Sequence, residues 1–357
     1  MTDESVSWSA FEQRAMGRAL ELAALGRYTT HPNPRVGCVV TQGEQIVGEG
    51  WHQRSGEPHA EVFALRAAGS AARGATAFVT LEPCNHYGRT PPCSEALIAA
   101  GVKRVIYACG DPNPRVDGSG AARLRAAGIA VHSGLLREQG EELNLGFFSR
   151  MRRRRPWLRL KMAASVDGRT ATAQGESQWI TSVAAREDVQ LWRAASAAIL
   201  STSSTVLADD PRLTARLAGL ERQPLRVLLD THGRIPRGAS VFAEPGEILH
   251  LTAETLPLDA EGRLSLPAAL ELLGEREINE VWTEAGPTLA GNLLALGLVD
   301  EAVLYLAPTW LGADARPLAA VPSLQRLADA ERWRVTDLRQ IGPDVRIMLR
   351  PALGGGG

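Results

Sequence analysis

The chain of 357 residues is long enough for two domains, and its 45% hydrophobic content allows a sizeable core in each. A formal net charge of −1 gives no overall attraction to nucleic acid or to anionic membranes. The sequence contains no run of about 18 apolar residues, so no membrane-spanning helix is expected. Four cysteines in so long a chain do not suggest a disulfide framework, so we expect a cytoplasmic protein with reduced thiols.

The first half begins with a helical pattern and continues with strands and helices in turn. Apolar residues at helical spacing predict a helix over residues 11–25, and a turn at Gly43 predicts a hairpin of strands 36–40 and 45–50. The other elements expected here are helices 61–68, 94–100 and 120–127 and strands 75–81, 102–108 and 129–132. This alternation favours parallel strands with helices on both faces. Cys38 and Cys109 lie in apolar strands and are predicted to be small core residues.

A basic run from Met151 to Pro156 marks the boundary between two domains, residues 1–150 and 151–357. We interpret this run as a solvated linker, since no aromatic residues accompany the charges as in a nucleic-acid-binding patch. The elements expected in the second half are helices 182–196 and 288–296 and strands 156–164, 198–201, 225–230, 280–283, 299–306 and 344–350.

Residues of the types that bind zinc follow one another in the first half: His59, Cys84 and Cys93. One imidazole and two thiolates suit tetrahedral zinc and leave a fourth position for water, whose pKa zinc lowers to about 7. Glu61 is placed to move that water's proton to a ring nitrogen and then to a leaving amine. This is the pattern of a hydrolytic deaminase. The alternative is a surface histidine with two core cysteines, and the order of these residues argues against it.

The spacing of the two cysteines departs from the usual deaminase motif. Eight residues, Asn85 to Pro92, separate them, where two are usual. We expect this inserted loop to determine which substrate is bound.

Further segments of both halves match one known pattern. They are residues 30–37, 56–61, 80–84, 88–93 and 110–114 in the first half and 160–169, 175–181 and 205–211 in the second. With these segments the chain resembles, over essentially its whole length, the bifunctional deaminase/reductase family of riboflavin biosynthesis, in which the long cysteine spacing is normal. The resemblance implies an α/β protein: an N-terminal cytidine-deaminase-like domain of three α/β/α layers and a C-terminal dihydrofolate-reductase-like α/β domain.

The resemblance also implies two successive reactions on one small phosphorylated pyrimidine. The first domain would use zinc to remove the 2-amino group of 2,5-diamino-6-(5-phosphoribosylamino)pyrimidin-4(3H)-one. The second would use NADPH to reduce C1′ of the ring-opened ribose, giving 5-amino-6-(5-phosphoribitylamino)uracil. We expect no nucleic-acid or membrane partner and a homo-oligomer, although the sequence itself does not determine the oligomeric state.

Binding residues follow from the same resemblance. Asn33 and His52 are implied to lie in the pyrimidine pocket, and His86 and Arg89 to contact the ribose phosphate, for which a guanidinium is well suited. The implied substrate residues of the reductase are Ser177, Arg193, Leu213, Arg216 and Glu284. The implied cofactor residues are Ala163, Trp179, Thr205, Asp209, Thr231, Gly286, Pro287, Thr288, Leu289, Ala290, Gly291 and Asn292.

Several of these assignments have simpler alternatives. Asn33 fits a turn residue, Lys161 an outward strand lysine and Trp179 a core aromatic residue. Lys161 and Asp209 are both candidate catalytic proton donors of the reductase, and the sequence does not rank them. The turn from Glu284 to Thr288 offers helix-start N–H groups to a phosphate, while a Rossmann glycine fingerprint is missing.

Two other functions stay open. A deaminase of bases within nucleic acid would need basic and aromatic surface around its pocket, and the near-neutral charge argues against it. A ligand-binding module without turnover would lack the glutamate or a metal ligand, and none is missing from the sequence.

Overall fold

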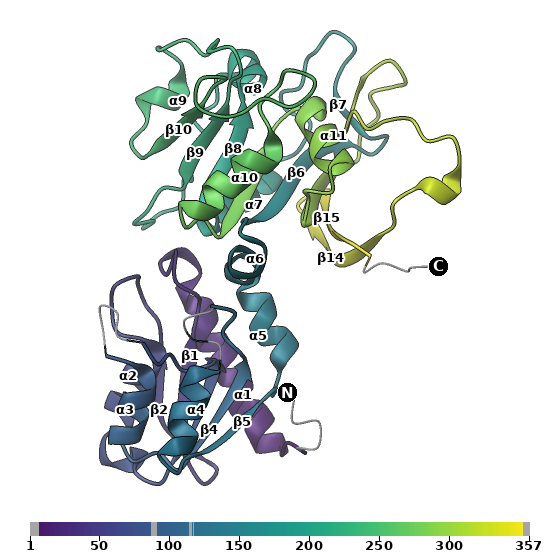
Figure 1. The fold of residues 1–357 in the computed structure, drawn as a ribbon. Helices are drawn as coiled ribbons and strands as arrows, with labels where there is room; N and C mark the ends of the chain where they lie inside the picture. The colour runs from purple at the N-terminus through teal and green to yellow at the C-terminus, as the bar shows by residue number, and fades with distance from the viewer. Residues whose placement is uncertain (1–6, 87–90, 114–115, 117, 353–357) are drawn as a thin grey trace. The chain divides into compact units, whose positions relative to one another are not determined.

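The computed structural model describes residues 7–86, 91–113, 116 and 118–352. It divides into two compact units, Met1–Arg153 and Arg154–Gly357 (Figure 1). Among the helices of the described residues, none combines the length and the apolar character that crossing a membrane requires.

A five-stranded sheet in the order β2-β1-β3-β4-β5 forms the centre of the first unit. Its strands are β1 (Gly37–Gln42), β2 (Gln45–Trp51), β3 (Thr76–Leu81), β4 (Arg104–Cys109) and β5 (Ala130–Ser133). The expected hairpin is confirmed: β1 and β2 are antiparallel and turn at Gly43, whose φ of 56° glycine adopts without strain. The pairs β3–β4 and β4–β5 are parallel, as expected.

Helices cover both faces of this sheet because successive strand residues point to opposite sides. Cys38, Val79 and Val105 pack with α2 (Ala60–Ala68), α3 (Cys93–Ala99) and α4 (Ser119–Ala126). Val39, Phe78 and Ile106 pack on the other face with α1 (Ala10–Ala24). The short helices η1 (Leu25–Tyr28) and η2 (Gly69–Ala72) follow α1 and α2. The expected three-layer α/β/α arrangement is therefore confirmed, and Cys38 and Cys109 are buried as predicted.

Two further helices, α5 (Arg137–Leu143) and α6 (Leu145–Arg153), are not predicted by the sequence pattern. Helix α6 contains part of the basic run, whose arginines lie in its last turn, where positive charge is favourable. Met151 packs against a cluster that includes Phe147 and Phe148, and Arg155 pairs with Asp300 at 2.9 Å. The prediction of a solvated linker is therefore wrong for Met151 and Arg155, whereas Arg152, Arg153 and Arg154 are exposed as expected.

The second unit is built on an eight-stranded sheet in the order β10-β9-β8-β11-β6-β12-β15-β14. The first six of these strands pair in parallel, and β15 and β14 are antiparallel additions at one edge. The strands are β6 (Trp157–Ser165), β8 (Ala198–Thr202), β9 (Leu225–Leu229), β10 (Ile248–Leu251), β11 (Glu280–Glu284), β12 (Glu301–Ala307), β14 (Trp333–Ile341) and β15 (Asp344–Pro351). A separate two-stranded sheet pairs β7 (Arg169–Ala171) with β13 (Arg316–Pro317).

Apolar clusters lie on both faces of the large sheet. One joins Leu160 and Val281 to α10 (Leu266–Glu275) and α11 (Pro287–Ala295), and the other joins Trp282 and Tyr305 to α7 (Val183–Ala195). The remaining helices are α8 (Ser203–Asp209), α9 (Ser240–Ala243) and η3 (Leu327–Asp329). Because the six parallel strands run the same way, β6, β8, β9 and β11 end at one edge of the sheet, the usual place for a ligand in such folds.

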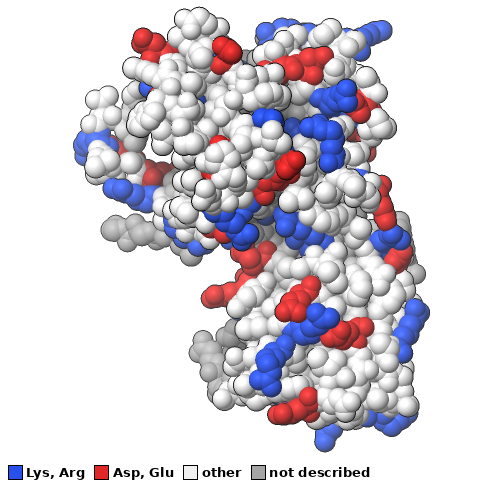
Figure 2. Space-filling view, turned by 180° about the vertical axis from the view of Figure 1, so that it is seen from behind, with Lys and Arg blue, Asp and Glu red and all other residues white. Residues whose placement is uncertain are grey.

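Charges of both signs are interspersed over the face of each unit that Figure 2 presents, without a broad area of either sign. This distribution matches the near-zero net charge of the chain.

Candidate active sites

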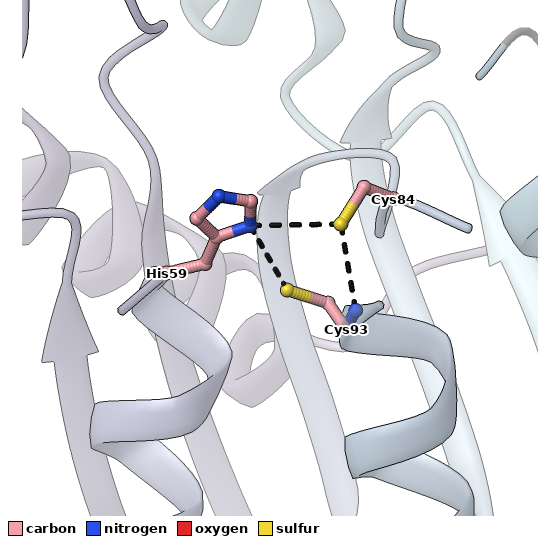
Figure 3. A group of neighbouring side chains, drawn as sticks. All are labelled: His59, Cys84 and Cys93. Carbon is pink, nitrogen blue, oxygen red and sulfur yellow. Dashed lines mark hydrogen bonds between the residues drawn. The ribbon is translucent and has the colours of Figure 1, made fainter. Parts of the chain in front are cut away.

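Three elements of the first unit bring His59, Cys84 and Cys93 together (Figure 3). His59 is the N-cap of α2, Cys84 follows β3, and Cys93 is the first residue of α3. The Nδ1 atom of His59 lies 3.2 Å from the Cys93 sulfur and 3.5 Å from the Cys84 sulfur. The three ligand atoms lie within 4.8 Å of one another, so one ion can contact all three.

The charge at this cluster also suits a cation. Hydrogen bonds from Cys93 and His59 lower the pKa of the Cys84 thiol. The hydrogen bond between His59 and Cys84 in turn raises the pKa of the His59 ring. The hydrogen bond with Cys84, together with burial, raises the pKa of Cys93. A zinc ion, which prefers thiolate and imidazole, fits this donor set.

Glu61 lies beside the cluster in the first turn of α2 and is only 3% exposed. Burial raises the pKa of its carboxyl group, which also interacts with His59 and Cys93. Its Oε2 atom has no hydrogen-bond partner among the described residues. A buried carboxyl oxygen without a partner is costly, and a water or substrate in the site would satisfy it.

His52 and Asn33 extend the site away from the three ligands. The Asn33 amide lies 3.0 Å from His52 Nε2, and His52 Nδ1 lies 3.2 Å from the Pro58 carbonyl. Since a carbonyl only accepts, Nδ1 carries the proton and Nε2 accepts from Asn33. Burial lowers the pKa of His52, which keeps the ring neutral, and this ring meets the His59 ring edge-on at 5.4 Å. The Asn33 N–H also donates to the Thr30 carbonyl, so Asn33 is a turn residue, and its place in the pyrimidine pocket stays a prediction.

The inserted loop is described only in part. Nδ1 of His86 is buried without a hydrogen-bond partner in the described part of the chain. Arg89 lies outside the described residues, so its expected phosphate contact remains a prediction.

A cavity of about 1350 Å³ opens at the strand ends of the second unit. This volume exceeds the range of typical single-ligand sites. The expected residues that line it are Lys161, Ala163, Ser177, Trp179, Arg193, Thr205, Asp209, Leu213, Arg216, Thr231, Glu284, Gly286, Pro287, Thr288, Leu289 and Asn292. Ala290 and Gly291 do not line it, because Ala290 is buried in the core and Gly291 packs against the Ala320 backbone.

The start of α11 contributes a phosphate-compatible edge to this cavity. Gly286 is the N-cap and Pro287 occupies the first turn, so the unbonded N–H groups of the helix start lie at the cavity wall. Such groups suit the diphosphate of a dinucleotide. Trp179 is 68% exposed with the Arg186 guanidinium 4.4 Å from its ring, so the alternative of a core aromatic residue is wrong.

Glu284 is held at the cavity by two side chains. Arg193 donates to its two oxygens at 2.6 and 2.7 Å, and the Trp282 indole donates at 2.7 Å. Burial alone would raise the pKa of Glu284, but Arg193 and Lys161 outweigh it and hold this pKa at about 2. Lys161 lies half-buried at the cavity, where burial lowers its pKa and Glu284 and Asp209 partly oppose that effect. It is therefore not an outward strand lysine.

The two expected substrate arginines differ in their surroundings. Arg193 is committed to Glu284 and to the Thr214 carbonyl at 3.0 Å. The guanidinium of Arg216 has no ion pair or hydrogen bond within the described residues, and burial together with Arg193 and Arg212 lowers its pKa. Arg216 is thus the arginine whose charge is available to a ligand.

Sequence reasoning missed other cavity residues, among them Arg186 and Gln190. They precede Arg193 by seven and three positions on α7, so all three lie on one helix face. That spacing was the available signal, but a polar face of a helix is usually solvated.

Comparisons with known proteins match both units. Residues 9–109 match the cytidine and deoxycytidylate deaminase zinc-binding region, and residues 156–347 match the RibD C-terminal domain. The chain is 52% identical over 358 residues to the riboflavin biosynthesis protein RibD of Escherichia coli K12, an alignment that covers 94% of this chain and 98% of that protein.

Two solved structures are similar over both units. One is RibD of Acinetobacter baumannii, with a TM-score of 0.89, 45% identity and coverage of 96% of this chain and 99% of that one. The other is the diaminohydroxyphosphoribosylaminopyrimidine deaminase/5-amino-6-(5-phosphoribosylamino)uracil reductase of Thermotoga maritima, with a TM-score of 0.86, 32% identity and coverage of 96% and 99%. The chain therefore belongs to the RibD family of bifunctional riboflavin-biosynthesis enzymes, which combine a deaminase and a reductase.

Proposed function

We propose that the first unit deaminates 2,5-diamino-6-(5-phosphoribosylamino)pyrimidin-4(3H)-one and that the second reduces the product to 5-amino-6-(5-phosphoribitylamino)uracil. The observation that carries the proposal is the His59, Cys84 and Cys93 cluster with the unpartnered carboxyl oxygen of Glu61 beside it. The Thermotoga maritima relative is named for the same two activities. In this assignment residues 1–150 form the deaminase and residues 151–357 the reductase.

In the deaminase, the residues of the chain position the pyrimidine and move protons. Zinc held by His59, Cys84 and Cys93 supplies a water that is reactive at neutral pH. Glu61 would take one proton from this water and pass it to the ring nitrogen, where it stays, and would then carry the remaining hydroxyl proton to the amine. A C2–O bond forms, the C2–N bond breaks, and ammonia leaves with the second proton. The neutral His52 ring orients the Asn33 carboxamide, whose oxygen is then free to accept a hydrogen bond from the pyrimidine.

Arg89 and His86 are proposed to bind the ribose phosphate. The support is the inserted loop, which places both residues between Cys84 and Cys93 in the sequence. The partnerless Nδ1 of His86 is a hydrogen-bonding group that a phosphate or ribose oxygen can satisfy.

In the reductase, NADPH supplies the hydride that reaches C1′ of the ring-opened imine. The start of α11 would hold the diphosphate, and Arg216 the substrate phosphate. The reduced imine nitrogen needs one proton. We favour Lys161 as its donor, because the ammonium carries protons and burial brings its pKa down from its usual value. Asp209, which also lines the cavity, is the alternative.

The test follows the two reactions separately in one sample. Zinc-replete protein receives the diaminopyrimidine phosphate and ammonia is measured; NADPH is then added and its oxidation followed. We expect ammonia before NADPH is present, and cofactor oxidation that depends on the deaminated product. Ammonia release that no zinc chelator abolishes, or faster oxidation of NADH than of NADPH, would contradict the corresponding half of the proposal.

We further propose a cytoplasmic homo-oligomer. The edge strand β14 exposes Val335 and Leu338, and an apolar sheet edge favours pairing with another chain. The four cysteines are free, and free thiols are typical of the reducing cytoplasm. Light scattering of the purified protein and cell fractionation would test these two points, and a monomer or a protein outside the cytoplasm would refute them.

A further inference from the structure

The pyrimidine-pocket residue Asn33 lies in a segment outside the regular elements, between η1 and β1. Its own backbone bond to the Thr30 carbonyl, at 2.8 Å, fixes only the start of this segment. The end of the segment is fixed by the backbone N–H of His52, which donates to the Val36 carbonyl at 2.9 Å. Between these points, the Arg35 backbone is oriented by a side chain from a distant part of the chain.

That side chain is Asn144, which is 3% exposed at the junction of α5 and α6. Its Oδ1 accepts from the Arg35 N–H at 2.8 Å, and its Nδ2 donates to the Arg35 carbonyl at 2.9 Å. One carboxamide thus satisfies both backbone polar groups of a residue only two positions after Asn33. A carboxamide supplies this donor and acceptor pair, whereas a carboxylate only accepts and an alkyl group does neither.

Packing supports the same contact. Phe147 and Phe148, in the first turn of α6, form a cluster with Leu81 and Cys109, and Val36 packs against that cluster. The Phe148 N–H also donates to the Asn144 carbonyl at 2.9 Å, which fixes Asn144 at the start of α6. Helix α6 therefore contacts the Asn33 segment through apolar side chains and through Asn144 together.

We propose that Asn144 is a positioning residue of the deaminase, which sets the place of Asn33 through the Arg35 backbone. The inference rests on the proposed role of Asn33 in binding the pyrimidine. Asn144 lies beyond the region that matches the zinc-binding deaminase domain, residues 9–109. The deaminase pocket thus depends on the helix that precedes the second unit.

The test uses Asn144→Asp in the full-length, zinc-loaded protein. This change keeps the acceptor for Arg35 N–H and places a second acceptor against Arg35 O. We expect the KM for ammonia release to rise about 10- to 100-fold, because a misplaced binding group loses its contact with the substrate. The kcat and the zinc content should change little. Reduction of supplied deaminated substrate should continue at the wild-type rate.

Gln42→Glu is the matched control. The Gln42 amide also donates to backbone carbonyls, those of Ala71 and Arg73 at 2.8 and 2.6 Å, but it lies at the other end of β1. Both changes replace a donor with an oxygen, so both lower stability, while only Asn144→Asp should raise KM. If Asn144→Asp does not fold, the uncharged variant Asn144→Ser, which is too short to make either contact, takes its place under the same criteria.

A double-mutant cycle separates positioning from a general structural effect. If Asn144 acts through Asn33, adding Asn144→Asp to Asn33→Ala should raise KM far less than it does in the wild type. An equal rise in both backgrounds, or an unchanged KM in the single variant, would overturn the inference. A wild-type protein that releases no ammonia would instead refute the proposed function itself.

Discussion

Replacing Glu284 with glutamine removes the buried carboxylate that faces Arg193 and Lys161 while keeping its shape. Its pKa of about 2, against an ordinary 4.5, corresponds to about 3 kcal/mol of stability at neutral pH. The side chains of Arg193 and Glu284 are only 10% and 14% exposed, so solvent screens the pair little. Breaking a buried pair from one side costs about 3–5 kcal/mol, and we expect Glu284→Gln to lose about 3 kcal/mol.

Denaturant unfolding followed by tryptophan fluorescence measures this loss, because most tryptophans lie in the second unit. The tryptophans of the second unit are Trp157, Trp179, Trp192, Trp282, Trp310 and Trp333. Glu247→Gln is the control. It breaks an Arg276–Glu247 pair of similar length, 2.9 Å, whose side chains are 43% and 67% exposed, and such exposed pairs contribute about 0–1 kcal/mol.

The pH dependence gives a second check on Glu284. Folding lowers the pKa of this group, so its contribution is fully present above the unfolded value near 4.5 and is lost as pH falls toward 2. The stability gap between wild type and Glu284→Gln should therefore narrow over that range. A gap below about 1 kcal/mol at neutral pH, or one that stays constant down to pH 3, would refute the reasoning.

Three further predictions concern the deaminase. Glu61→Gln should keep zinc and lower ammonia release by about 10²- to 10⁴-fold while reduction continues; loss of both activities would contradict independent sites. Gly120→Ala places a Cβ 1.8 Å from the carbonyl oxygen of Pro83, next to a zinc ligand, and should weaken zinc binding about 10- to 100-fold in a chelator titration. Gly17→Ala, whose Cβ meets no atom of the described residues within 4 Å, should instead stabilise the protein by up to about 1 kcal/mol. Equal zinc affinities of the Gly120→Ala and Gly17→Ala variants would argue against the clash. Arg89→Ala should raise the deaminase KM for the phosphorylated substrate, and an unchanged KM would exclude the phosphate role.

Local patterns account for what the sequence predicted well. Strand β1 alternates between its two helical layers, and α1 carries apolar residues at helical spacing, so both elements were found within a residue or two. His59, Cys84 and Cys93 were recognisable because each lies at the end of a strand or the start of a helix. Their residue types and their order along the chain, at the ends of predicted elements, therefore identify them as a group.

Helix α6 shows where local patterns are insufficient. Its last turn holds Arg150, Arg152 and Arg153, so the charge run concealed a helix whose first turn buries Phe147 and Phe148. Asn144 carries no sequence signal, because its role depends on a contact with Arg35, which lies 109 positions away. Such contacts follow from the tertiary fold and not from any periodicity.

The reductase cavity shows the same limit in its electrostatics. Family resemblance places Arg193, Glu284 and Arg216 in one site as three substrate contacts, and all three line the cavity. The sequence does not reveal that Arg193 and Glu284, 91 positions apart, neutralise each other. Two arginines converging on a phosphate would need both charges to be available, yet the charge of Arg193 is balanced by a carboxylate that it contacts with two nitrogens. We therefore propose that Arg216 supplies the attraction for a phosphate at this end of the cavity, while Arg193 holds Glu284 in its ionised form.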